Sequence, residues 1–78
     1  MYYFKKEKKD EILQGRTITY VANNFLYRTK SFVSAVLSGK RGCSYKSARD
    51  IVNIVGTHLD LNNYFYEDKT KPIYVKNN

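Results

Sequence analysis

Three hydroxyl residues, Thr17, Thr29 and Ser44, each stand directly before a run of apolar residues with helical spacing. A Ser or Thr at such a position favours a helix start, because its side-chain oxygen accepts a hydrogen bond from a free backbone N–H. Gly39 and Gly56 follow the last periodic residues of two of these runs, where helices commonly end. The pattern predicts three consecutive amphipathic helices in the middle of the chain.

The apolar residues of these helices mark the faces that we expect to be buried. They recur at intervals of three and four positions, the spacing of one helix face. They are Ile18, Val21, Ala22, Phe25 and Leu26, then Val33, Val36 and Leu37, then Tyr45, Ala48, Ile51, Val52 and Val55. Two further helices are predicted, Lys5–Gln14 and Asp60–Tyr66. Asp60 caps the last one, which packs Leu61 and Phe65 inward.

The two ends of the chain are compatible with short strands. Tyr2–Phe4 can form one, and Pro72–Val75 can form a second strand that pairs with it. No apolar run approaches the ~20 residues of a membrane span, and the N-terminus does not read as a secretory signal. One cysteine excludes an internal disulfide and fits a reducing compartment, so we expect a cytoplasmic protein of one domain.

Charge is distributed unevenly along this chain, whose net charge is +7. From Ile12 through Arg49 there is no Asp or Glu, and the seven basic residues of this window are Arg16, Arg28, Lys30, Lys40, Arg41, Lys46 and Arg49. A block of one sign repels itself and therefore suggests an anionic partner. Chance combined with a need for solubility is the alternative interpretation.

The central helices carry a family resemblance. A short helix, a tight connection and a helix ending in Leu-x-Gly-Lys occupy residues 17–41, and "SYKSARDIVNIVG" follows at 44–56. This resembles the helix-turn-helix family of phage repressors and Cro-like regulators (the XRE-like class), over roughly residues 5–66. The matching positions are Thr17, Ala22, Val33, Val36, Leu37, Gly39, Lys40, Ala48, Ile51 and Gly56. The resemblance implies an all-α, five-helix lambda-repressor-like domain at residues 1–66, with a C-terminal tail at 67–78.

Two positions depart from the family pattern. The family commonly has a glycine between its two central helices, whereas this chain has Leu26, Tyr27 and Arg28 there and one residue more. We therefore expect a wider turn in which Tyr27 or Arg28 takes up the additional length. The family also often has a Gln after the opening Thr, where this chain has Ile18, so that contact must come from elsewhere or be absent.

The resemblance implies that the helix from Thr29 to Ser38 enters the major groove of double-stranded DNA. Lys30, Ser31 and Ser34 would then face base edges, with Phe32 close enough to touch a thymine methyl. Two alternatives stay open: the serines can belong to an ordinary exposed helix face, and Phe32 can cover part of the core.

Phosphate contacts are expected around this helix. Backbone N–H groups at helix starts near Thr17 and Thr29 favour anions. Basic side chains expected to flank the duplex backbone are Arg28, Lys40, Arg41 and Lys46. After the helix that is expected to enter the major groove, Gly39 would end that helix and Gly42 would relax the turn before Ser44.

No catalytic chemistry is predicted. Cys43 is expected to be a small semi-buried filler, and His58, the single histidine, a surface or boundary residue. These two cannot assemble a zinc site, and no nucleophile with a placed base stands out. We expect no catalytic residues, no metal, no cofactor and no enzymatic activity.

These features predict a small sequence-specific transcriptional regulator of phage or mobile-element type, which acts by operator occupancy and is nucleoid-associated when bound. A homodimer is expected, because such regulators usually bind two half-sites and tyrosine is favoured at interfaces. The aromatic residues near the ends are Tyr2, Tyr3, Phe4, Tyr64, Phe65, Tyr66 and Tyr74. Of these, Phe4 and Phe65 are expected inside and some tyrosines at the subunit contact.

A second function from another class fits the same features. A phage-type inhibitor, such as an anti-CRISPR protein or an antirepressor, could use this fold to bind a protein rather than DNA. Its basic face would then occupy the nucleic-acid channel of the target. The surplus aromatic residues and the two departures from the family pattern favour this alternative.

Overall fold

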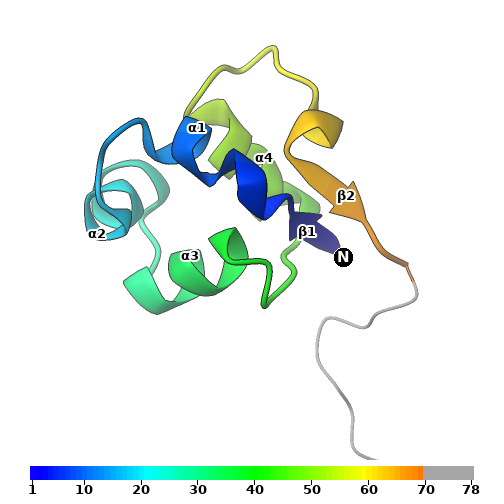
Figure 1. The fold of residues 1–78 in the computed structure, drawn as a ribbon, viewed down its shortest axis with the longest axis horizontal. Helices are drawn as coiled ribbons and strands as arrows, with labels where there is room; N and C mark the ends of the chain where they lie inside the picture. The colour runs from blue at the N-terminus through cyan, green and yellow to red at the C-terminus, as the bar shows by residue number, and fades with distance from the viewer. Residues whose placement is uncertain (70–78) are drawn as a thin grey trace, which may run out of the picture.

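The computed structural model describes residues 1–69, which form four α-helices and a two-stranded sheet (Figure 1). The helices are α1 (Lys9–Leu13), α2 (Ile18–Val21), α3 (Lys30–Leu37) and α4 (Tyr45–Asn53), and the strands are β1 (Tyr2–Phe4) and β2 (Phe65–Glu67). Three helical turns complete this part of the chain: the 3-10 turns η1 (Lys6–Lys8) and η3 (Leu61–Asn63), and the π-turn η2 (Ala22–Leu26). The protein is a small, mostly helical domain with a short sheet.

The three predicted helix starts are confirmed. The hydroxyl oxygens of Thr17, Thr29 and Ser44 each accept a hydrogen bond from the backbone N–H three residues later, at 3.0, 3.1 and 3.2 Å. Gly39 follows α3 with a φ of +79°, a left-handed conformation that glycine adopts without a steric penalty. The ends of the central helices are therefore set by local sequence.

The connection between the two central helices begins with the π-turn η2. A π-turn contains one residue more than an α-helical turn, so it absorbs an insertion without breaking the helix. Tyr27 closes η2 with a φ of +54°, and its N–H donates to the Ala22 carbonyl. Tyr27 therefore lies where the chain leaves the π-turn, and its role in a turn wider than the family's stays a prediction. The wider turn also leaves Phe25 40% exposed, so the predicted burial of Phe25 is wrong.

The predicted helix at 60–66 is also wrong. Asp60 does act as a cap, accepting from the Asn62 N–H at 3.0 Å, but the helical turn it starts is only η3. Phe65–Glu67 is extended, because its backbone pairs antiparallel with Tyr2–Phe4. The strand at Tyr2–Phe4 is thus confirmed, with β2 as its partner. The strand predicted at 72–75 and Tyr74 lie outside the described residues.

The other edge of β1 holds the loop that follows α3. Tyr2 and Cys43 exchange two backbone hydrogen bonds of 2.9 and 2.8 Å. Figure 1 shows α2 at one end of the molecule and the sheet at the other, with α3 and its loop between them. The sheet therefore fixes the position of the loop that carries Lys40 and Arg41.

One apolar core joins all these elements. Its buried residues are Phe4, Ile12, Val21, Ala22, Val33, Val36, Leu37, Cys43, Ala48, Ile51, Val52, Leu61, Tyr64 and Phe65. Phe4 and Phe65 lie inside as predicted, with their ring centres 5.2 Å apart. Tyr45 was predicted to be buried but is 55% exposed, because it starts α4 and packs against the edge of Tyr2 instead. His58 is exposed, as predicted.

Candidate nucleic-acid interface

The outer side of α3 forms a shallow, open hollow. Its lining residues are Lys30, Ser31, Ser34, Ala35, Ser38 and Lys40. Positions 30, 31, 34 and 38 share one side of a helix, and the opposite side of α3 is buried in the core. The structure thus brings together Lys30, Ser31 and Ser34, three of the four predicted base-contacting residues, with the predicted phosphate contact Lys40.

Lys40 reaches this hollow because the chain folds back after Gly39. The backbone N–H groups of Lys40 and Arg41 both donate to the Ala35 carbonyl, at 3.1 and 3.3 Å. These bonds help to satisfy a carbonyl of the last turn of α3, which also accepts from the Ser38 hydroxyl at 3.0 Å. The two basic residues are consequently held against the end of α3 rather than projecting away from it.

Phe32, the fourth predicted base contact, lies apart from the other three. Its ring is half-buried and packs against the core, in agreement with the alternative interpretation of this residue. The guanidinium carbons of Arg28 and Arg41 lie 3.9 and 4.8 Å from the centre of the ring. The structure therefore joins Phe32 to two of the predicted phosphate contacts.

The remaining predicted phosphate contacts are distributed along the helix starts. Thr17 and Thr29 are exposed, and their hydroxyl oxygens are occupied as helix caps. Lys46, in the first turn of α4, lies 3.1 Å from the Asp50 carboxylate. An exposed pair of this kind contributes about 0.2–1 kcal/mol, so a phosphate could displace Asp50 from Lys46 at small cost.

Cys43 forms the floor of the region near Arg28 and Arg41. It is 4% exposed, which is deeper than the semi-buried position predicted for it. Burial raises the pKa of the Cys43 thiol to about 11, although the positive charges of Arg28 and Arg41 act in the opposite direction. The thiol is therefore uncharged at neutral pH.

Gly42 has a steric role in the same loop. A Cβ atom at this position would lie 2.5 Å from Met1 Cγ and 3.0 Å from Tyr3 Cε1. The missing side chain lets the loop pass directly beneath the first residues of the chain, and its φ is not in the left-handed region. Glycine is thus needed at position 42 because a side chain would collide with Met1 and Tyr3, and not because it relaxes the turn as predicted.

Two features of the surface were not predicted. Arg28 Nη1 donates a hydrogen bond of 3.1 Å to Ser47 Oγ in α4. The contact of Arg28 with Phe32 could have been predicted from their spacing of four residues. Tyr20 and Phe25 form an exposed aromatic patch on α2 and η2, with exposures of 50% and 40%, and Tyr27, which follows η2, is 82% exposed. Phe25 became part of this patch through the π-turn.

Comparisons with families of proteins, with curated proteins and with solved structures found no match to this chain. Within residues 1–69, no helix combines the length and the apolar character that crossing a membrane requires. In the same part of the chain, no three His, Cys, Asp or Glu side chains are grouped so that they could hold a metal ion.

Proposed function

We propose that this chain is a small sequence-specific double-stranded DNA-binding protein, a transcriptional regulator of phage or mobile-element type that acts by occupying an operator. This proposal rests on one observation: Lys30, Ser31, Ser34 and Lys40 line the same hollow. Ammonium and hydroxyl groups are donors and acceptors suited to base edges and phosphates. In this proposal α2 with η2 and α3 act as a helix-turn-helix, and α3 enters the major groove.

The charges around the hollow support an anionic ligand. No carboxylate lines it, and neither Lys30 nor Lys40 takes part in an ion pair within the described part of the chain. Both lysines are exposed, so their ammonium groups are available to phosphates without loss of an internal partner. We assign Lys30, Ser31 and Ser34 to base edges. The proposed phosphate contacts are Thr17, Arg28, Thr29, Lys40, Arg41 and Lys46.

The experiment that tests this function is an unbiased selection of bound duplexes from a random DNA pool, followed by salt titration of the selected duplex. We expect a defined motif, and a log–log salt slope of about −0.9 for each phosphate contact. Binding that survives a large excess of unrelated DNA supports sequence recognition. Absence of any enrichment, together with no duplex binding at low salt, would contradict the proposal.

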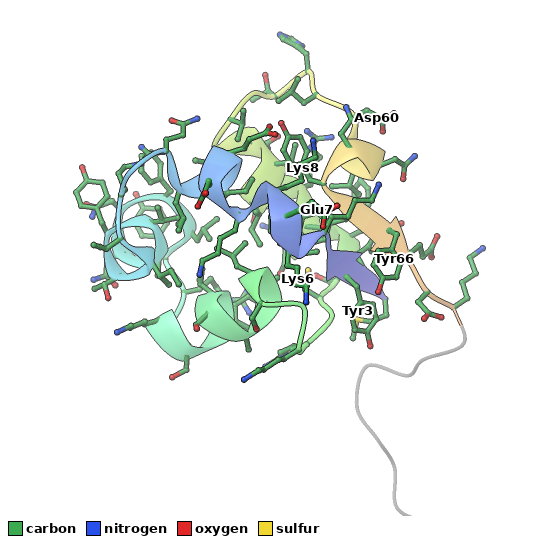
Figure 2. All side chains as sticks on the ribbon, viewed as in Figure 1. Tyr3, Lys6, Glu7, Lys8, Asp60 and Tyr66 are labelled. Carbon is green, nitrogen blue, oxygen red and sulfur yellow. The ribbon has the colours of Figure 1, made fainter. Side chains whose placement is uncertain are left out.

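A homodimer is part of this proposal, and the exposed side of the sheet is its candidate contact. Tyr3 and Tyr66 stack there with ring centres 5.9 Å apart, and Tyr66 is 46% exposed (Figure 2). Tyrosine is enriched at interfaces because it combines large contact area with a polar group. Sedimentation equilibrium of the wild-type protein and of Tyr66→Ser tests the contact: we expect dimers that the substitution weakens.

The exposed aromatic patch favours the alternative function, an inhibitor of the anti-CRISPR or antirepressor class that binds a protein. Tyr20 and Phe25 have ring centres 6.1 Å apart, and the Arg16 guanidinium carbon lies 4.4 Å from the centre of the Phe25 ring. Aromatic and arginine side chains of this kind dominate the energetics of many protein interfaces. The duplex titration at low salt separates the two functions, since the inhibitor requires no affinity for DNA.

A further inference from the structure

Two positively charged side chains share one aromatic ring beside α3. Arg28 precedes the helix and Arg41 follows it, yet both guanidinium groups lie over Phe32. Contact with the ring face favours each cation, whereas two like charges at one ring repel each other. No carboxylate pairs with either arginine within residues 1–69. The nearby carboxylate of Asp50, which lines a neighbouring hollow with Arg28 and Phe32, is paired with Lys46 instead.

Several contacts hold these arginines in place. Phe32 packs against the core, so the ring itself is fixed. Arg28 donates to Ser47 Oγ at 3.1 Å, and the backbone N–H of Arg41 donates to the Ala35 carbonyl at 3.3 Å. A guanidinium has five N–H donors, and the bond to Ser47 uses only one of those in Arg28. The other N–H donors of Arg28 make no hydrogen bond within residues 1–69.

The two arginines open onto a single hollow. Its lining residues are Met1, Arg28, Phe32, Arg41, Gly42, Cys43, Ser44 and Ser47. None of these carries a carboxylate, and the Cys43 thiol contributes no negative charge at neutral pH because burial raises its pKa to about 11. The hydroxyl groups of Ser44 and Ser47 add polar atoms at the start of α4. The hollow has the chemistry of a site for a small oxyanion.

We propose that Arg28 and Arg41 form an arginine clamp that grips one phosphodiester group of the duplex backbone, with Phe32 as the positioning residue between them. The clamp rests on the proposed DNA-binding function and gives Phe32 a role other than a base contact. Planar guanidinium groups match the geometry of phosphate oxygens with two parallel hydrogen bonds. An ammonium group carries the same charge but can neither make that paired contact nor stack as a planar group.

The experiment compares Arg28→Lys and Arg41→Lys with the wild-type protein on one duplex. Arg16→Lys is the matched control, because Arg16 also stacks on a phenylalanine but does not line the hollow. We expect each clamp substitution to raise Kd about tenfold and the control to change it less than twofold. The salt slope should stay constant in the lysine variants, whereas Arg41→Ala should reduce its magnitude by about 0.9. Equal melting temperatures would show that all variants fold.

The outcomes separate the clamp from the function on which it rests. Wild-type binding with tenfold weaker Arg28→Lys and Arg41→Lys variants, at unchanged salt slope, supports the clamp. Wild-type binding that both lysine variants reproduce would overturn the clamp and leave the DNA-binding function standing. If the wild-type protein binds no duplex at low salt, both proposals fail together.

Discussion

The Tyr64 hydroxyl donates a hydrogen bond of 2.9 Å to the Glu11 carboxylate, joining residues 53 positions apart. It connects α1 to the segment between η3 and β2, so it links the two ends of the described chain. The hydrogen bond from Tyr64 and a second from Lys8 lower the pKa of Glu11 below its ordinary value of 4.5. The same bond raises the pKa of Tyr64.

From this contact we predict a stability difference that depends on pH. Because the pKa of Glu11 is lower in the folded protein, its stabilising effect is present above pH 4.5 and declines as pH falls through the folded value. Tyr64→Phe should therefore be less stable than the wild-type protein at pH 7, and the difference should shrink at pH 3. Urea unfolding at both pH values measures it, with Tyr66→Phe as the control. A difference that is the same at both pH values would contradict the role of the ionised carboxylate.

Local sequence signals were sufficient for the central helices. Thr17, Thr29 and Ser44 are helix caps and Gly39 is left-handed, because each of these preferences depends on backbone groups within a few residues. The exposed positions of α3 follow from the same periodicity. The grouping of Lys30, Ser31 and Ser34 could therefore be predicted from spacing alone.

Contacts between distant segments caused two of the failures, and a local irregularity of the helix caused the third. The helical pattern predicts a helix at Phe65 and Tyr66, but pairing with β1 at the other end of the chain makes them extended. The same pattern predicts Phe25 in the core, but the π-turn changes the phase of the helix by one residue and exposes it. Arg28 and Arg41 both contact Phe32 because the chain folds back after α3. The periodicity of apolar residues does not predict that change of direction.

Gly42→Ala should destabilise the protein. The added Cβ would lie 2.5 Å from Met1 Cγ, so Met1 and the Tyr3 ring must move. Overpacking of this kind typically costs about 1–3 kcal/mol in the free energy of unfolding. Urea unfolding measures it, with Thr57→Ala in an exposed turn as a control expected within about 0.5 kcal/mol of wild type. Equal stability of the two variants would show that the chain start is free to shift.

Ala22→Leu should also destabilise the domain, for a different reason. Ala22 is fully buried where η2 begins, and η2 contacts α3. A larger side chain would push the two segments apart, with an expected loss of about 1–3 kcal/mol. Thermal unfolding followed by circular dichroism measures the loss, and Asn23→Leu at the exposed neighbouring position is the control. A melting temperature equal to that of the wild type would rule out close packing at Ala22.

Substitutions in the α3 hollow should separate base contacts from phosphate contacts. Lys30→Ala and Ser34→Ala should each reduce discrimination between the selected duplex and unrelated duplexes, by roughly 1–3 kcal/mol for a good base contact. Lys40→Ala should weaken binding to both duplexes equally, because a phosphate contact carries no sequence information. Competition titrations of the three variants provide the measurement. Unchanged discrimination in both Lys30→Ala and Ser34→Ala would show that other residues contact the base edges.

Cys43 should make the stability of the protein fall at alkaline pH. Burial raises the pKa of its thiol from 9.0 to about 11, so between these values the unfolded chain releases a proton that the folded chain retains. The stabilising preference for the neutral thiol is complete below pH 9 and is lost as pH rises towards 11, at most about 3 kcal/mol in all. Urea unfolding of wild type and Cys43→Ala at pH 8 and pH 10.5 isolates this effect from other groups that titrate there. The wild-type protein should lose stability relative to the variant. Parallel losses would mean that the thiol has the same pKa in the folded and in the unfolded protein.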